Sequence, residues 1–177
     1  MKKIMIIGSG GSGKSVMARK LGDITKLPVY HLDALFWKPG WVATPNDEWD
    51  DMQKELIQRD EWIIDGMYNR TLDIRLSAAD TVIFIDLPRW ITTYRVIKRR
   101  VQYHGKTRPD LHDGCPEKLD WAFVKWVWNF PKNRRAIIME KIQKHANKNV
   151  IILRSLKDID ELIEQAKRET GAFRRLS

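Results

Sequence analysis

Short apolar runs alternate with longer amphipathic stretches along this chain. The apolar runs are rich in aliphatic residues and predict strands at 3–7, 29–32, 62–64, 81–85 and 150–153. Each run is continuously apolar, so both faces of each strand should be covered. This is typical of parallel sheets.

Helices are predicted between these strands by helical periodicity and by start and stop signals. The first covers 13–23, and the second starts at Thr44, with Pro45 in its first turn and Asp47 completing a capping box. The third covers 89–103, and the last covers 157–170 and ends at Gly171. The alternation predicts an α/β fold with an open parallel sheet between two layers of helices.

The regular pattern breaks between the fourth and fifth strands. Loops are expected around 104–109 and 114–116, followed by two helices, 116–129 and 131–146, that Pro131 separates. One apolar stripe on the first of these helices is interpreted as core packing in preference to a ligand site; it consists of Leu119, Phe123, Trp126 and Phe130. We expect a single domain, 1–177, in which about 104–135 forms a lid.

A phosphate-binding loop follows the first predicted strand. Residues 8–15 read G-S-G-G-S-G-K-S, which matches the G-x-x-x-x-G-K-[ST] pattern completely. Backbone amides of such a loop surround the phosphates, the lysine reaches the β- and γ-phosphates, and the hydroxyl of the last residue can hold Mg²⁺. The sequence therefore predicts that a nucleoside triphosphate and Mg²⁺ bind at Gly8, Ser9, Gly10, Gly11, Ser12, Gly13, Lys14, Ser15 and Val16.

Three acids stand at the carboxyl ends of predicted strands, where open parallel sheets bind their ligands. Asp33 is our candidate to orient or deprotonate the acceptor in phosphoryl transfer, although it could instead bind a water of Mg²⁺ or cap a turn. Asp65 could line the site or cap a turn, and Asp86 is a candidate metal ligand beside Ser15. His31 shares a strand face with Asp33, so the two could pair, or His31 could be a core histidine.

Basic residues are concentrated in one part of the chain. The net charge is +9, and 89–135 holds twelve Lys and Arg against four Asp and Glu. Such a surplus indicates a polyanion, either nucleotide phosphates or nucleic acid, although most single members could form a solvated basic face. Candidates to stabilise the transferred phosphoryl group are Arg95, Arg99, Arg100, Arg134 and Arg135.

Further motifs carry a family resemblance. They are H-L-D-A-L-F-W-K-P-G-W at 31–41, W-I-I-D-G-M-Y at 62–68, A-D-T-V-I-F-I-D-L-P at 79–88, R-V-I-K-R-R at 95–100, G-K-T-R-P-D at 105–110 and G-C-P-E at 114–117. Together with the phosphate loop, they make the chain similar to the bacterial DNA topology modulation proteins, in the adenylate-kinase-like branch of P-loop kinases. The resemblance implies a five-stranded parallel sheet in the order 2-3-1-4-5, Mg-ATP as phosphoryl donor, and a turn at Arg154 that borders the adenine.

The function predicted from these features is phosphoryl transfer from Mg-ATP to a small-molecule acceptor such as a nucleotide, nucleoside or related metabolite. Residues expected near the acceptor are Asp33, Trp37, Trp41, Asp65, Tyr68, Arg70 and Arg75. The alternatives are a nucleotide-gated DNA-binding regulator that affects DNA topology, and a GTPase-like switch or plain ATPase. The absence of an [NST]-K-x-D motif disfavours GTP. The single cysteine, Cys115, excludes an internal disulfide, and a cytoplasmic location is expected, with no membrane partner and the oligomeric state left open.

Overall fold

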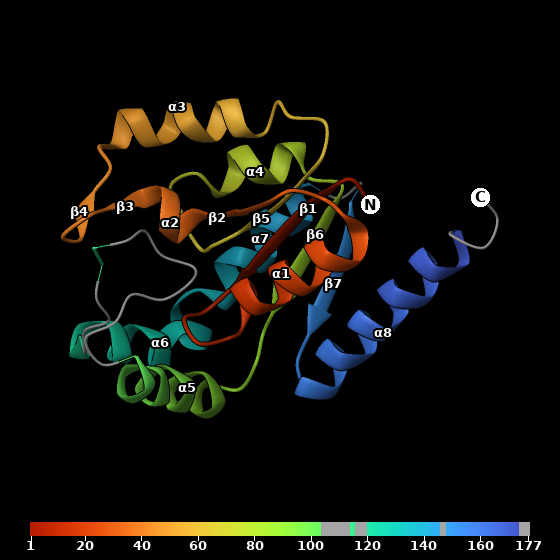
Figure 1. Cartoon of the computed structure of the whole chain (residues 1–177). Helices are drawn as coiled ribbons and strands as arrows, with labels where there is room; N and C mark the ends of the chain where they lie inside the picture. The colour runs from red at the N-terminus through yellow and green to blue at the C-terminus, as the bar shows by residue number, and fades with distance from the viewer. Residues whose placement is uncertain (104–113, 116–119, 146–147, 174–177) are drawn as a thin grey trace.

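A twisted, five-stranded parallel sheet forms the centre of the computed structural model, which describes residues 1–103, 114–115, 120–145 and 148–173 (Figure 1). The strands lie in the order β2-β5-β1-β6-β7. Their bounds are β1 (Lys3–Gly8), β2 (Val29–His31), β5 (Trp62–Asp65), β6 (Thr81–Ile85) and β7 (Asn149–Leu153). Counted along the chain, this order is 2-3-1-4-5, which confirms the predicted sheet.

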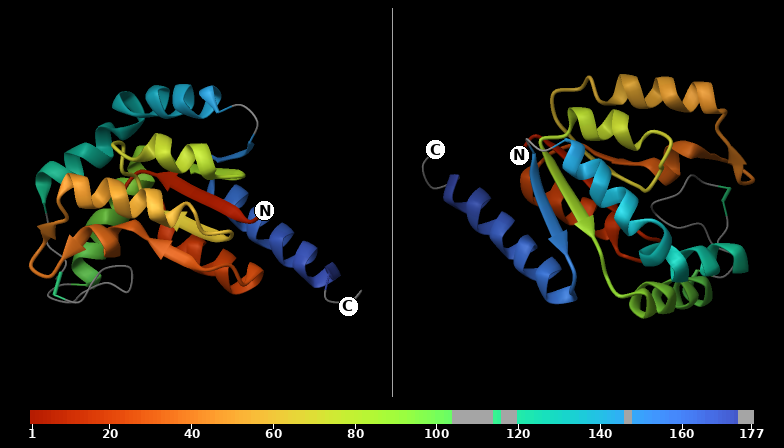
Figure 2. Two further views of the ribbon diagram at one scale, coloured as in Figure 1. Left: turned by 90° about the horizontal axis from the view of Figure 1, so that it is seen from above. Right: turned by 180° about the vertical axis from the view of Figure 1, so that it is seen from behind.

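Each face of the sheet is covered by helices because both faces are apolar. Met5 and Ile7 of β1 pack in one core with the helices of the first layer, whereas Ile4 and Ile6 point into the opposite core. The first layer contains α3 (Asn46–Leu56), α4 (Leu72–Ala78) and α7 (Arg135–Lys144), and the second contains α1 (Lys14–Thr25) and α8 (Leu156–Phe173). Figure 2 shows these layers from two further directions, and they confirm the predicted α/β sandwich.

Two further units lie beyond the carboxyl ends of the strands. Helices α5 (Arg89–Gln102) and α6 (Trp121–Asn133) pack side by side around Val96, Val124 and Val127. The other unit follows β2 and consists of the short helix α2 (Leu32–Phe36) and the hairpin of β3 (Trp37–Lys38) and β4 (Val42–Ala43). Because β1, β5 and β6 are parallel neighbours, both units lie near the end of β1 at which the phosphate loop begins.

Some predicted helix boundaries are wrong. Helix α3 begins at Asn46 with Pro45 as its N-cap, and the Thr44 hydroxyl donates to the Phe36 carbonyl instead of capping the helix (2.8 Å). Pro131 lies inside α6, where it removes one hydrogen bond near the helix end, and the chain breaks at Arg134. Helix α8 continues through Gly171, because a glycine within a helix costs only about 1 kcal/mol.

The predicted lid lies partly outside the described residues. Its loop 104–109 and all of 116–119 are not described, whereas 121–135 forms α6 and the first residue of α7. Between them, Gly114 and Cys115 pack on the β3–β4 hairpin: the Gly40 N–H donates to the Gly114 carbonyl (2.9 Å), and the buried Cys115 thiol donates to the Lys38 carbonyl (3.3 Å). No helix in the described residues is long and apolar enough to cross a membrane.

Candidate active site

The phosphate loop joins β1 to α1 and packs directly against the backbone of α5. Gly11 has a left-handed backbone (φ 73°), and a Cβ added there would lie 2.3 Å from the Thr92 carbonyl oxygen of α5. Only glycine fits both the conformation and the space. The Lys14 ammonium donates to the Ser9 carbonyl across the loop (2.8 Å). The loop is therefore closely packed, and its glycines leave the backbone amides free of side-chain cover, as a phosphate-binding loop requires.

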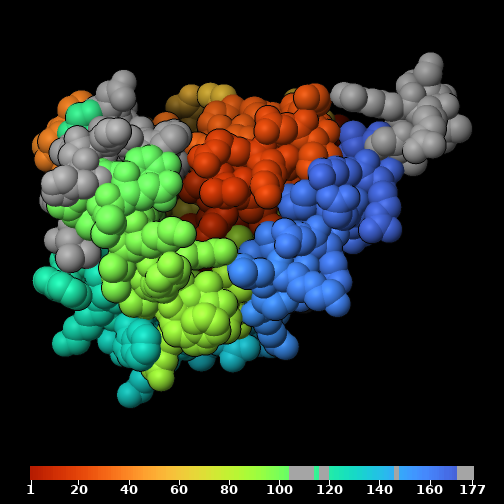
Figure 3. Space-filling model, turned by 60° about the horizontal axis from the view of Figure 1, so that its bottom comes forward, coloured from red at the N-terminus to blue at the C-terminus, as the bar shows by residue number. Residues whose placement is uncertain are grey.

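A cleft of about 520 Å³ extends from this loop between α1, α5 and α8, and Figure 3 shows the surface hollowed between these helices. Arg95 and Arg99 line it from α5, one helical turn apart. Leu156, Ile159 and Asp160 line it from α8. The lining combines the phosphate loop, two lysines and three arginines with aliphatic side chains, which suits a triphosphate joined to a base. We call it the nucleotide cleft.

Asp65 connects the phosphate loop to the neighbouring strand. It ends β5, is 3% exposed, and accepts a hydrogen bond from the Ser15 hydroxyl (2.8 Å). Its other oxygen is hydrogen-bonded to His31 Nδ1, so His31 pairs with Asp65. Hydroxyl and carboxylate oxygens are the ligands that Mg²⁺ prefers, so Ser15 and Asp65 fit a magnesium site beside the phosphates.

Asp86 is predicted to bind the metal beside Ser15, but its carboxylate is hydrogen-bonded to a residue outside the phosphate loop. It follows β6, on the other side of β1, and accepts a hydrogen bond from Arg135 Nε (2.7 Å). The described residues hold no group of three or more His, Cys, Asp or Glu side chains that could form a dedicated metal centre. A site with few protein ligands is typical of Mg²⁺ that also binds substrate phosphates.

A second cleft, of about 610 Å³, lies on the other side of Lys14. Five residues line both clefts and mark where they meet: Gly10, Lys14, Asp33, Arg99 and Phe123. Trp37, Trp41 and Tyr68, all predicted near the acceptor, line the second cleft, together with Met67 and Trp126. We call it the acceptor cleft.

Asp33 lies in the first turn of α2, immediately after β2. Its carboxylate accepts a hydrogen bond from the Tyr68 hydroxyl (2.8 Å). Burial, together with the negative charge of Asp33, raises the pKa of Tyr68 well above its ordinary value. Tyr68 therefore remains a donor at neutral pH and holds one oxygen of Asp33 in place, while the carboxylate borders both clefts.

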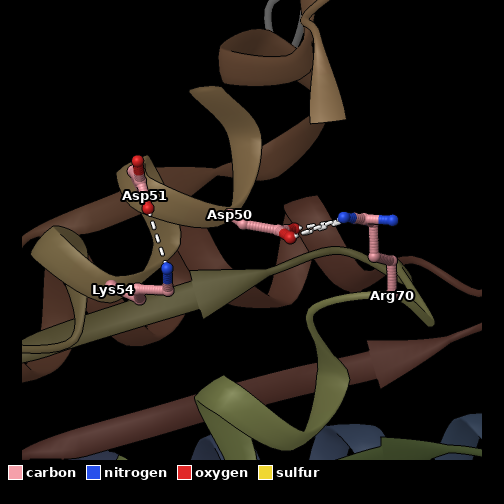
Figure 4. A network of polar contacts seen from close by, with 4 residues as sticks. All are labelled: Asp50, Asp51, Lys54 and Arg70. Atoms are coloured by element: carbon pink, nitrogen blue, oxygen red, sulfur yellow. Dashed lines mark hydrogen bonds and ion pairs between the residues drawn. The ribbon is translucent and has the colours of Figure 1, made fainter. Parts of the chain in front are cut away.

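Two arginines predicted near the acceptor are engaged outside the cleft. Arg75 is fully buried and donates to the carbonyl oxygens of Gly66 (3.0 Å) and Tyr68 (2.9 Å), so it fixes the loop that presents Tyr68. Arg70 forms a two-pronged ion pair with Asp50 of α3 (2.7 and 2.9 Å), which Figure 4 shows. Neither arginine lines the acceptor cleft.

The predicted phosphate-binding arginines divide into two groups. Arg95 and Arg99 line the nucleotide cleft, whereas Arg100, Arg134, Arg135 and Arg154 are not among the residues that line either cleft. Arg100 is one position beyond Arg99 and therefore points about 100° away around α5. Arg154 lies in the turn between β7 and α8, where its backbone N–H donates to Asp158 (2.7 Å).

The aromatic stripe of α6 is both a core face and part of the cleft: Trp126 packs against buried core residues, as predicted. Phe130 is buried, as predicted, but Phe123 and Trp126 stack on each other (ring centroids 5.7 Å apart) and line the acceptor cleft. Leu119 lies outside the described residues. The sequence carries one signal for this lining, because α6 has more aromatic residues than a single packing face needs. A second feature, which only the structure reveals, is the left-handed backbone of Trp41 (φ 62°) in the turn of the β3–β4 hairpin, a conformation that is uncommon for a bulky residue.

Comparison with solved structures agrees with this architecture. A shikimate kinase from Acinetobacter baumannii in complex with shikimate superposes with a TM-score of 0.57 at 12% identity, covering 93% of this chain and 90% of its own. A shikimate kinase from Bacteroides thetaiotaomicron (TM-score 0.54, 12% identity, 95% and 97% covered) and a gluconokinase from Sinorhizobium meliloti 1021 (0.51, 13%, 97% and 93%) are also similar.

The chain thus has the fold of the P-loop small-molecule kinases. At 12–13% identity, these likenesses show the fold alone. No protein-family model matches the chain, and no curated protein sequence is significantly similar to it. The resemblance to the topology modulation proteins therefore stays a prediction.

Proposed function

We propose that this protein is a kinase that transfers the γ-phosphoryl group of Mg-ATP to a hydroxyl group of a small molecule. One observation carries the proposal: Asp33 lies where the nucleotide cleft and the acceptor cleft meet, together with Lys14 and Arg99. A carboxylate and two cations at this junction are the groups that phosphoryl transfer requires. The shared fold of shikimate kinases and a gluconokinase supports a small acceptor.

The nucleotide side would bind and neutralise the triphosphate. The loop amides and Lys14 would surround the β- and γ-phosphates, while Arg95 and Arg99 would donate to the oxygens of the transferred group. Ser15 and Asp65 would hold Mg²⁺, which supplies charge neutralisation when bound. His31 would fix the orientation of Asp65 through their hydrogen bond.

On the acceptor side, Asp33 would accept the proton of the attacking hydroxyl. The oxygen of that hydroxyl forms the new bond to phosphorus, the bond to the β-phosphate oxygen breaks, and ADP leaves. Tyr68 holds Asp33 by a hydrogen bond that does not depend on a bound ligand (2.8 Å). The carboxylate is therefore positioned before the acceptor arrives.

The proposal is tested by incubating the protein with Mg-ATP and a panel of nucleosides, nucleotides and sugar-like metabolites. ADP release is followed continuously, and phosphorylated products are identified by mass spectrometry. We expect ADP release that depends on one class of acceptor, with a matching phosphorylated product. ADP release at the same rate with and without every acceptor would indicate an ATPase and contradict the proposal.

Nucleic-acid binding is a second candidate, favoured by one surface of α5. Trp90 and Tyr94 are 65% and 62% exposed there, one helical turn apart, and the same helix carries Arg89, Lys98 and Arg100. Exposed rings among cations are typical of proteins that bind single strands, and the resemblance to the topology modulation proteins points the same way. Binding to DNA measured across salt concentrations tests this function. Affinity that vanishes near physiological salt would leave only nonspecific attraction.

A further inference from the structure

The acceptor cleft differs from the nucleotide cleft in its charge. Seven residues line the acceptor cleft alone: Trp37, Trp41, Met67, Tyr68, Asp120, Ala122 and Trp126. Four of them are aromatic and one is a carboxylate, and among the described residues that line this side there is no Lys or Arg. The described residues that line this side alone therefore offer no cation to bind a negatively charged acceptor.

The cations that could serve this cleft either also line the nucleotide cleft or are engaged outside both clefts. Lys14 and Arg99 line the nucleotide cleft as well, where the triphosphate would bring several negative charges. Arg75 is buried against two carbonyl oxygens, and Arg70 is paired with Asp50 on α3 (Figure 4). The described part of the chain therefore provides no arginine clamp for a phosphate or carboxylate of the acceptor.

Among the described residues, the one charged side chain that lines the acceptor cleft alone is the carboxylate of Asp120, whereas Asp33 is shared with the nucleotide cleft, as Lys14 and Arg99 are. Asp33 lines it at the junction with the nucleotide cleft. Asp120 lines it at the start of α6, where one carboxylate oxygen accepts a hydrogen bond from the Ala122 N–H (2.8 Å). Asp120 is an exposed residue, so water partly screens its repulsion of an anion and the effect is modest. A neutral acceptor avoids this repulsion.

Aromatic side chains reach the cleft from two elements. Trp37 and Trp41 belong to the β3–β4 hairpin and meet edge to face (5.5 Å between ring centroids, 68°). Phe123 and Trp126 belong to α6 and are stacked (16° between ring planes). Figure 1 shows the hairpin and α6 at the same end of the sheet. Rings from two separate elements offer stacking surfaces for a planar group.

We propose, on the basis of the kinase function above, that the acceptor is an uncharged alcohol with a planar ring, of the nucleoside class. The hydroxyl to be phosphorylated points to Asp33, and the planar ring lies among the tryptophans. The corresponding monophosphates, as well as acceptors that carry a carboxylate, bind weakly because the triphosphate engages Lys14 and Arg99, and the described residues leave only the Asp120 carboxylate as a charge on the acceptor side alone. The acceptor thus differs in charge from shikimate and gluconate.

The test compares matched ligands that differ only in charge. Binding of the four ribonucleosides and their 5′-monophosphates is measured by tryptophan fluorescence, because three tryptophans line the cleft. The nucleotide cleft is first saturated with Mg²⁺ and a non-hydrolysable ATP analogue, so that only the acceptor cleft is sampled. Shikimate and gluconate serve as carboxylated comparators. We expect at least one nucleoside to bind about tenfold or more tightly than its monophosphate.

Three variants connect the result to these residues. Asp120→Asn removes one negative charge but keeps the helix cap, so the preference for the neutral ligand should fall about threefold. Asp51→Asn removes an equally exposed charge on α3, outside the cleft, and should leave the preference unchanged. Trp41→Gly removes a ring and relieves the left-handed backbone, so it should fold and yet weaken nucleoside binding about tenfold.

The outcomes separate the two proposals. Failure of the ATP analogue to bind would overturn the kinase function itself. Binding of the analogue with equal or tighter binding of monophosphates, shikimate or gluconate would overturn the neutral acceptor and leave the kinase function intact. Binding of the analogue with no detectable nucleoside binding would overturn the planar-ring acceptor in the same way.

Discussion

Alanine at Gly11 should disrupt the phosphate loop far more than alanine at Gly40, although both glycines have the same type of backbone. Their φ angles are 73° and 78°. An added Cβ at Gly11 would lie 2.3 Å from the Thr92 carbonyl oxygen and 3.0 Å from Val96 Cγ2, whereas at Gly40 nothing lies within 4 Å. The pair therefore separates the cost of the conformation from the cost of the contact.

The magnitudes follow from these distances. A left-handed alanine costs about 1–2 kcal/mol at either position. At Gly11 the close contact with a backbone oxygen adds about 1–3 kcal/mol, because the α5 backbone cannot rotate away as a side chain would. Each kcal/mol lowers the melting temperature by roughly 2–4 °C in a protein of this size. Gly11→Ala should thus be the clearly less stable variant.

The effect on ligand binding should be larger than the effect on stability. If the loop moves to relieve the contact, its amides no longer converge on the phosphates, and misplacement by about 1 Å costs up to about 100-fold. Thermal denaturation and calorimetric titration with Mg-ATP measure both effects. We expect Gly11→Ala to bind at least about tenfold more weakly and Gly40→Ala to bind like the wild type. Binding of Mg-ATP by Gly11→Ala within twofold of wild type would refute the preformed phosphate loop.

Three further predictions concern the other parts of the site. Asp65→Asn should lower Mg²⁺-dependent ADP release by about 100-fold. Asp86→Asn alters the pair with Arg135 and should change the rate little. Equal losses in the two variants would indicate that Asp86 also binds the metal. Asp33→Asn should abolish transfer while calorimetry still registers Mg-ATP binding, and retained turnover would remove Asp33 from its role. Arg75→Met should lower the free energy of unfolding by about 3–5 kcal/mol in urea denaturation, because two buried carbonyls lose their donors; a loss below about 1 kcal/mol would contradict that role.

Most of the fold follows from the sequence because its signals are local. The continuous apolar runs locate all five strands of the sheet to within one residue, and both faces of the central strands β1, β5 and β6 are buried. The phosphate loop is equally local, because its glycines are needed for the turn itself. The hairpin after β2 was missed, because a strand of two residues such as β3 carries no periodicity.

The site was harder to predict because its contacts are formed between distant segments. Both Asp65 and Asp86 end a strand next to β1, and the sequence gives no reason to prefer one as the partner of Ser15. The choice depends on Arg135, 49 positions away from Asp86, which occupies that carboxylate. In the same way, Arg70 and Arg75 have the charge expected near an acceptor, but Asp50 and backbone carbonyls engage them instead.

The proposed function depends on a phosphate loop that is already shaped to hold a triphosphate before the ligand binds. Calorimetric titration of the folded wild type with Mg-ATP tests this directly, with Lys14→Ala as the comparison, because Lys14 is the cation that closes the loop. We predict binding of one Mg-ATP per chain, and binding at least about tenfold weaker in the variant. The absence of heat with both Mg-ATP and Mg-GTP would contradict the account.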